Sequence, residues 1–297
     1  MYQVTCMHDR DIQCFGDCPG CIRAEINRLE ELEEEIYRLE LNKIYNEDCL
    51  EGMKRIPDKS IDMILCDLPY GTTACKWDIV IPFEPLWEQY ERIIKDGGAI
   101  VLFGSEPFSS ALRMSNIKNF KYDWIWNKKL AGNGILAKRQ PLKIHEIISV
   151  FNSNIYIPQM TKGKMRKKMG LKESEITGGN SFAKEYVNDE YYPVSIQEFS
   201  IANLRRGRLH PTQKPVALCE YLIKTYTKEN EVVLDNCAGS FTTAVACDNT
   251  NRNWICIEKE EEYCNIGLKR INDNRERLSL PLLKLYNSRG DLIGEDD

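Results

Sequence analysis

The chain has 297 residues, of which 42% are hydrophobic and 29% charged, and its formal net charge is −5. These values are typical of a globular protein with one large domain. No apolar run approaches the roughly 20 residues of a membrane span, and the N-terminus lacks the apolar core of a signal peptide. We therefore expect a cytoplasmic protein without a membrane partner.

Charge is distributed unevenly along the chain. Residues 113–214 contain 19 Lys and Arg against 8 Asp and Glu, and the remainder of the chain is acidic. A basic segment of this kind indicates a surface that meets a polyanion, although an ordinary solvated face has the same composition.

The N-terminal region, residues 1–42, is expected to form a cysteine-rich arm followed by an amphipathic helix. Over residues 22–42 apolar side chains recur at steps of three and four, which is typical of a helix. Four cysteines have a spacing compatible with a tetrahedral structural zinc site, with free thiols as the alternative: Cys6, Cys14, Cys18 and Cys21. Such an arm would serve self-association or DNA contact, so a homodimer is one expectation.

From residue 43 onward, strand patterns alternate with helix patterns. Apolar runs predict strands at 43–46, 60–67, 99–105, 121–129, 145–153, 231–239 and 253–260. Periodicity and end signals predict helices at 83–98, where two glycines end the pattern, and at 215–228, 240–250 and 261–275. This alternation predicts an α/β fold with a doubly wound, mostly parallel sheet.

Two segments do not fit this alternation. Residues 158–208 lose regular periodicity and carry clusters of basic residues, so we expect an irregular insertion there. Residues 281–297 are expected to form a loosely attached tail.

Polar residues end three predicted strands, at the edge where open α/β sheets bind ligands. The strand predicted at 60–67 ends in the tetrapeptide "DLPY" at 67–70. Glu258, at the tip of the last predicted strand, lies where an acidic residue would hold the hydroxyls of an adenosine ribose. The Gly-x-Gly-x-x-Gly pattern of dinucleotide sites is absent from the sequence. The strand predicted at 231–239 runs into a turn and the start of a helix. The candidate ligand-binding residues there are Asp235, Asn236, Gly239 and Thr242.

These motifs resemble those of the amino-group DNA methyltransferases that use S-adenosyl-L-methionine, in the permuted order with the catalytic tetrapeptide first. The resemblance covers about residues 43–275. "DLPY" resembles the family's Asp-Pro-Pro-Tyr, and "DNCAGSFTT" at 235–243 resembles Asp-x-Phe-x-Gly-x-Gly-Thr-Thr. "HPTQKP" at 210–215 resembles the cofactor-side motif that precedes the latter. The resemblance implies a Rossmann-like methyltransferase fold, with a catalytic half at 43–157 and a cofactor-binding half at 209–280.

The resemblance also implies which residues bind the cofactor. Phe241 stands where the family has its second glycine, and we expect it to crowd the turn beside the methionine group. An ordinary turn aspartate is the alternative for Asp48, and a surface lysine is the alternative for Lys214. The implied positions are Asp48, Thr212, Lys214, Asp235, Asn236, Gly239, Thr242 and Glu258.

The tetrapeptide suits chemistry on an amino base. The exocyclic amine of adenine or cytosine is a poor nucleophile because its lone pair is delocalised into the ring. The Asp67 carboxylate and the Leu68 carbonyl would face its two N–H groups and localise the lone pair. Pro69 would stiffen the turn, and Tyr70 would stack on a base flipped out of the duplex. Adenine N6 is favoured because cytosine members of the family more often carry serine at the position of Asp67.

Double-stranded DNA is the implied partner, and 158–208 is the expected target-recognition region. The sequence shows no nuclease motif, so a restriction enzyme would be a separate protein. A cytosine-N4 or RNA methyltransferase, or a DNA-binding protein that lost turnover through Phe241, are the alternatives. The candidates for phosphate contacts are Lys162, Lys164, Arg166, Lys167, Lys168, Arg205, Arg206 and Arg208.

Overall fold

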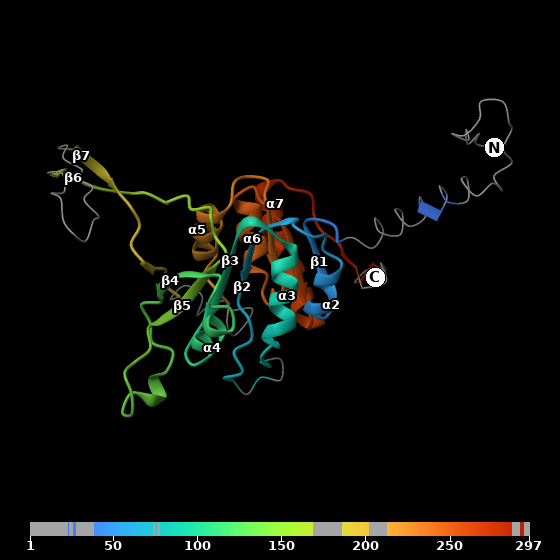
Figure 1. Ribbon diagram of the computed structural model, residues 1–297, viewed down its shortest axis with the longest axis horizontal. Helices are drawn as coiled ribbons and strands as arrows, with labels where there is room; N and C mark the ends of the chain where they lie inside the picture. The colour runs from blue at the N-terminus through green and yellow to red at the C-terminus, as the bar shows by residue number, and fades with distance from the viewer. Residues whose placement is uncertain are drawn as a thin grey trace.

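Figure 1 shows a computed structural model of the protein. The structure describes residues 23, 26–27, 39–73, 75, 78–168, 186–201, 213–286 and 292–293. The four N-terminal cysteines of the predicted zinc site lie outside these residues. Of the helix predicted at 22–42, three described residues are helical and exposed: Arg23, Ile26 and Asn27. Within the described ranges, no helix is long and apolar enough to cross a membrane.

A twisted sheet of ten strands runs through the molecule in the order β12-β11-β1-β10-β9-β2-β3-β5-β4-β8. The six neighbours from β11 to β3 pair in parallel, and β5 pairs antiparallel with both β3 and β4. The predicted doubly wound, mostly parallel sheet is confirmed. The strands are β1 Lys43–Asn46, β2 Ile61–Cys66, β3 Ile94–Gly104, β4 Phe120–Asn127, β5 His145–Phe151, β8 Ile196–Glu198, β9 Val232–Asp235, β10 Asn253–Glu258, β11 Leu285–Tyr286 and β12 Leu292–Ile293.

Helices cover both faces of this sheet (Figure 1). The α-helices are α2 Cys49–Lys54, α3 Phe83–Ile93, α4 Phe108–Ser115, α5 Val216–Tyr226, α6 Thr242–Asn249 and α7 Glu261–Leu278, and a short 3-10 helix spans Gly134–Leu136.

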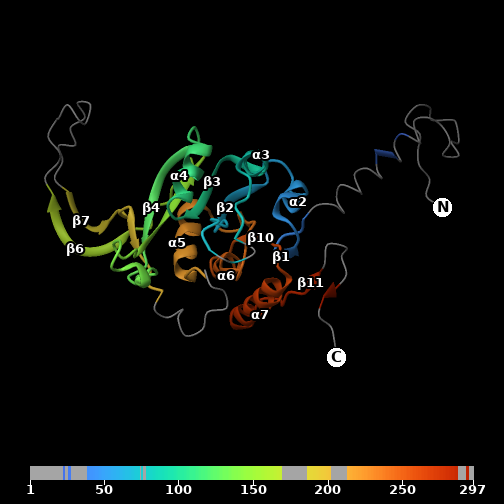
Figure 2. The same ribbon diagram turned by 90° about the horizontal axis from the view of Figure 1, so that it is seen from below.

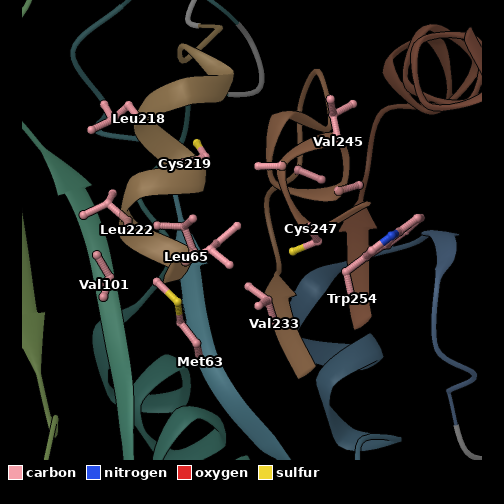
Figure 3. Close-up of a cluster of buried hydrophobic side chains, with 14 of the residues drawn as sticks. Met63, Leu65, Val101, Leu218, Cys219, Leu222, Val233, Val245, Cys247 and Trp254 are labelled. Carbon is pink, nitrogen blue, oxygen red and sulfur yellow. The ribbon is translucent and has the colours of Figure 1, made fainter. Parts of the chain in front are cut away.

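The run Ile61–Cys66 is apolar at almost every position because β2 is central and both its faces are buried. Met63 and Leu65 point to the cluster under α5 and α6, and Figure 3 shows them beside Leu222 of α5. The alternate residues Ile64 and Cys66 pack in the second cluster, under α2 and α3. The alternation of faces therefore builds two cores from one strand.

The glycines at 97–98 lie inside a strand, so the prediction that they end a helix is wrong. Helix α3 ends at Ile93, and β3 begins with the next residue. Gly97 has a φ of +80°, and a Cβ on Gly98 would lie 2.8 Å from the carbonyl oxygen of Asp62. The pairing register of β2 and β3 shifts at this point, and the glycines permit the close approach.

The described part of residues 158–208 is more regular than the sequence predicts. Strand β6 Thr161–Lys168 pairs antiparallel with β7 Tyr186–Tyr191, and β8 extends the main sheet beside β4. Figures 1 and 2 show that the β6–β7 ribbon stands away from the body of the molecule. Exposed residues run along β6, so the strand has no core to impose an apolar period.

The start of the predicted tail is attached to the sheet. Strand β11 pairs in parallel with β1, which covers what would be an exposed edge. The side chain of Asn272 on α7 also exchanges two hydrogen bonds with the backbone of Leu283, at 2.8 and 3.1 Å. The expectation of a loose tail is wrong for residues 281–286.

Candidate active site

A cavity of about 320 Å³ opens at the carboxyl ends of the central strands. Strands β1, β10, β9 and β2 are consecutive and parallel, so the residues that follow them meet at one edge of the sheet. The cavity is lined by Asp48 after β1, Asp67 after β2, Asp235 at the end of β9 and Glu258 at the end of β10. Gly239, in the turn after β9, lines the same cavity.

The Asp67 carboxylate is held by two donors. The Lys214 ammonium lies 2.5 Å from Oδ2, and the Tyr70 hydroxyl donates to Oδ1 over 2.6 Å. Burial raises the pKa of Asp67 above its ordinary value, and the charge of Lys214 only partly offsets this effect. Burial alone would lower the pKa of Lys214, but its carboxylate neighbours raise that pKa above the ordinary value, so the lysine is charged.

Lys214 also approaches Glu146, a residue of β5 that the sequence did not single out. Nζ of Lys214 is 3.4 Å from Oε2 of Glu146, while Lys128 is 3.0 Å from Oε1. Burial would raise the pKa of Glu146, but the charges of Lys214 and Lys128 bring it below the ordinary value. Strand β5 runs antiparallel to β3, so its first residues reach the edge where β3 ends. A chain of alternating charges results, from Lys128 to Asp67, in which Lys214 is buried and the other three side chains are half-buried.

The rest of the tetrapeptide has a divided arrangement. Pro69 lines the cavity, whereas the Leu68 side chain is buried in the core. The Tyr70 ring stacks on Phe108 at a centroid distance of 5.0 Å and an interplanar angle of 28°. One face of Tyr70 is therefore already covered by protein.

The turn after β9 is fixed by buried hydrogen bonds. The Thr243 hydroxyl donates to Oδ2 of Asp235 over 2.6 Å, and burial raises the pKa of Asp235 to about 7. Tyr90 of α3 donates to the Asn236 side chain over 2.6 Å. The backbone N–H of Gly239, whose φ is +50°, donates to the Glu258 carboxylate over 2.7 Å. These bonds place backbone and carboxylates of β9 and β10 around one end of the cavity.

Phe241 does not crowd this turn, so the expected obstruction of the methionine group is not found. Its backbone is left-handed at a φ of +57°, a conformation that a glycine would adopt more easily. Its side chain is fully buried and packs against Gly267 of α7, away from the lining of the cavity. Phe241 can therefore stand at a position where the family has glycine, because its ring fills a space in the core and does not enter the cavity.

Two predicted cofactor residues have a second role in the structure. Asp48 caps α2, since Oδ1 accepts from the backbone N–H of Leu50 over 2.9 Å, and it also lines the cavity. Thr242 lines the cavity while its hydroxyl accepts from Arg270 over 2.9 Å. Thr212 lies outside the described residues.

Asp78 is a further residue that the sequence did not single out. Its carboxylate accepts from the backbone N–H groups of Gly71, Thr72 and Thr73 at 2.7 to 2.9 Å. Although burial opposes it, a hydrogen bond from the Thr73 side chain and these backbone bonds lower the pKa of Asp78. Asp78 thereby fixes the loop after the tetrapeptide. Its only sequence signal is its place eight residues beyond Tyr70, which local patterns do not interpret.

The predicted DNA-contacting residues fall into two groups. Four side chains on β6 are exposed: Lys162, Lys164, Arg166 and Lys167. Lys168 belongs to the same strand. Arg205, Arg206 and Arg208 lie outside the described residues.

The cavity fits S-adenosylmethionine in its charge and in its donor set. Its lining carries more carboxylates than ammonium groups, which suits a ligand whose sulfonium and ammonium groups outweigh its carboxylate. Burial raises the pKa of Glu258, yet the carboxylate at the strand tip is placed as ribose-binding acids are. In the described part of the chain, no group of three or more potential ligands is arranged to hold a metal ion.

Comparison with known proteins identifies the family. Residues 61–269 match the model of the N6/N4 family, described as DNA methylase. The chain is 26% identical over 256 residues to the DNA adenine methyltransferase YhdJ of Escherichia coli, covering 78% of this chain and 83% of that protein. It is 27% identical over 263 residues to the type II methyltransferase M.HinfI of Haemophilus influenzae, covering 78% and 69%.

Solved structures agree with this assignment. M1.HpyAVI in complex with S-adenosylmethionine is 26% identical, with a TM-score of 0.53, covering 77% of this chain and 98% of that one. The cytosine-N4-specific PvuII methyltransferase has a TM-score of 0.56 and 15% identity, covering 81% and 93%, and shares the fold. The chain belongs to the N6/N4 amino-group DNA methylase family, whose methyl donor is S-adenosylmethionine.

Proposed function

We propose that the protein methylates N6 of adenine at a specific sequence in double-stranded DNA. One observation carries this proposal: Asp67, after β2, and Gly239, in the turn after β9, line the same cavity. An amino group held at Asp67 and a methyl donor held at the turn would therefore be neighbours, and alignment of the two accounts for much of the rate.

The tetrapeptide supplies the acceptors for the amino group. The Asp67 carboxylate takes one N–H of the amine and the Leu68 carbonyl the other, which localises the nitrogen lone pair. Bound S-adenosylmethionine supplies a sulfonium methyl carbon that this lone pair attacks, while the electrons of the broken carbon–sulfur bond remain on sulfur. The nitrogen then gives one proton to Asp67, which passes it to water.

Tyr70 is proposed to stack on the flipped base. Phe108 covers one face of its ring, so the base would use the other face. Extrusion of a base from the duplex costs a few kcal/mol, which stacking on an aromatic ring partly offsets.

Adenine is the proposed base because of the tetrapeptide and the named relatives. Asp67 stands where cytosine members more often have serine, and YhdJ is named an adenine methyltransferase. Cytosine N4 is the second candidate, since PvuII methyltransferase shares the fold and the same amine chemistry.

The β6–β7 ribbon is the proposed DNA-binding element. A two-stranded ribbon fits the major groove of B-DNA, and the exposed basic side chains of β6 suit the phosphate backbone. A separate restriction enzyme, a homodimer and zinc at the N-terminal cysteines stay predictions.

Identification of the modified base tests the proposal. DNA from cells that express the protein should contain N6-methyladenine at one sequence, and cells expressing Asp67→Ala should lack it. N4-methylcytosine at that sequence would select the second candidate, and unmodified DNA in an expressing strain would reject both.

A further inference from the structure

Lys214 lies between two carboxylates at unequal distances. Its ammonium is 2.5 Å from Oδ2 of Asp67 and 3.4 Å from Oε2 of Glu146. Among the described residues, this Oε2 is one of three buried side-chain polar atoms without a hydrogen-bond partner. Oε2 thus keeps only the longer ion pair with Lys214, and it can accept a shorter, hydrogen-bonded contact from that ammonium in another state of the site.

Asp67, in contrast, has a donor on each oxygen. Tyr70 occupies Oδ1 and Lys214 occupies Oδ2. Each carboxylate oxygen can accept two hydrogen bonds, but the ammonium on Oδ2 makes that oxygen a weaker acceptor for an amine N–H and for its proton, so the site gains if a donor moves away. The lysine is the mobile one, because its ammonium ends a flexible four-carbon side chain and has a second carboxylate beside it.

We propose that Glu146 is a positioning residue, which receives the Lys214 ammonium when an amino group binds Asp67. This inference rests on the proposed methyl transfer. Lys214 moves between two anions, so the site keeps its net charge throughout and no ammonium is left buried without a partner. Lys128 stays on Oε1 and fixes the Glu146 carboxylate in place.

This arrangement explains why a half-buried glutamate lies close to the catalytic carboxylate. While Lys214 is on Asp67, it neutralises the carboxylate and keeps the empty site stable. Once Lys214 is on Glu146, the freed oxygen of Asp67 can accept from the amine and later take its proton. The titratable and charged groups that face Asp67 and Glu146 are Lys128, Lys214, Tyr70, Cys66, Cys219 and Asp235.

The Glu146→Gln variant of the full chain tests the inference, assayed with S-adenosylmethionine and duplex DNA. The amide attracts an ammonium less than a carboxylate does, so Lys214 should stay on Asp67 and kcat should fall at least about tenfold. The KM for S-adenosylmethionine should not change. The acid limb of the pH–rate profile should also move to lower pH, because the Glu146 charge raises the pKa of Asp67. A static charge at Glu146 would shift that limb as well, so the fall in kcat at the plateau of the profile, with an unchanged KM, is what reports the movement of Lys214.

Glu198→Gln is the matched control, because Glu198 ends β8 at the same edge of the sheet and forms its ion pair with an exposed lysine, Lys129, at 2.6 Å. It should leave kcat and the pH profile unchanged. An active wild type together with an unaltered plateau kcat in Glu146→Gln overturns the inference alone, whether or not the acid limb shifts. A wild type that methylates no DNA overturns the proposed function instead.

A structure of the wild-type ternary complex with duplex DNA decides the question even if Glu146→Gln does not fold. The distance from Lys214 Nζ to Oε2 of Glu146 should shorten to about 2.8 Å, the length of a charge-assisted hydrogen bond. Lys214 still bound to Asp67, with the target amine in place, would contradict the inference.

Discussion

Asp235 shows how burial controls the ionisation of a single residue in this site. The sequence indicated this residue by its position before the Gly239 turn. Its pKa, however, depends on how far the helices and neighbouring strands bury it from solvent. Burial raises that pKa to about 7, and the Thr243 hydroxyl only partly opposes the rise. The protonated form is therefore favoured in the folded state far more than in the unfolded chain.

This shift predicts a pH dependence of stability. The unfolded chain loses the Asp235 proton near pH 4, and the folded protein holds it until about pH 7. The stabilisation from the proton is thus complete below pH 4 and is lost as the pH rises to about 7. Thermal unfolding from pH 4 to pH 8 should show a smaller loss of Tm in Asp235→Asn than in wild type. Parallel Tm curves for the two proteins would contradict the raised pKa.

Glu146 and Lys128 mark the limit of prediction at this scale. Asp67, Asp235 and Glu258 follow strands in recognisable motifs, so their convergence could be predicted from the sequence. Glu146 is the second residue of an antiparallel strand, and its contact with Lys214 depends on the order of β3, β5 and β4 in the sheet. No local pattern contains that order.

At the scale of elements, the start of α6 packs against α7 through the large side chain of Phe241, at a position where the family has glycine. The buried ring of Phe241 occupies the space beside Gly267, where an added Cβ would lie 2.0 Å from the ring. The sequence suggested that Phe241 would obstruct the cavity because the motif alone does not tell to which side the ring turns.

Gly267→Ala should destabilise the protein, although alanine in a helix is ordinarily favoured by roughly 0.5–1 kcal/mol. The clash with Phe241 should cost about 1–3 kcal/mol, as overpacking of a core does. Chemical denaturation measures the difference in the free energy of unfolding. Asp273→Ala, at an exposed position of the same helix, is the control and should be nearly neutral. Equal stability of Gly267→Ala and wild type would show that the ring has room to move.

The β6–β7 ribbon carries the second prediction at this scale. Replacing Lys162, Lys164 and Arg166 by alanine should weaken binding to duplex DNA and reduce the slope of log Kd against log salt by about 0.9 for each phosphate that is no longer neutralised. A triple alanine variant of Lys59, Lys118 and Lys228, which precede β2, β4 and β9 at the opposite edge of the sheet, removes the same charge and should keep the slope. Equal slopes in both variants would place the DNA elsewhere.

At the scale of the whole molecule, the sequence predicted the α/β class and most central elements because buried strands and helices leave strong periodic signals. The ribbon and the attached segment 281–286 were harder to predict. Their pairing depends on partners distant in the chain, and exposed or very short strands have no apolar period. The site forms only when the two halves of the sheet meet at β2 and β9, with the tetrapeptide on one side and the cofactor turn on the other.

The most direct test compares methyl transfer and cofactor binding in Asp67→Ala. Removal of the carboxylate should lower kcat at least about a hundredfold, as loss of a preorganised electrostatic group at a reacting centre does. Calorimetry should still detect S-adenosylmethionine binding, because the turn after β9 is untouched, and Asp58→Ala at an exposed site should behave as wild type. Undiminished transfer by Asp67→Ala would contradict the role given to this carboxylate.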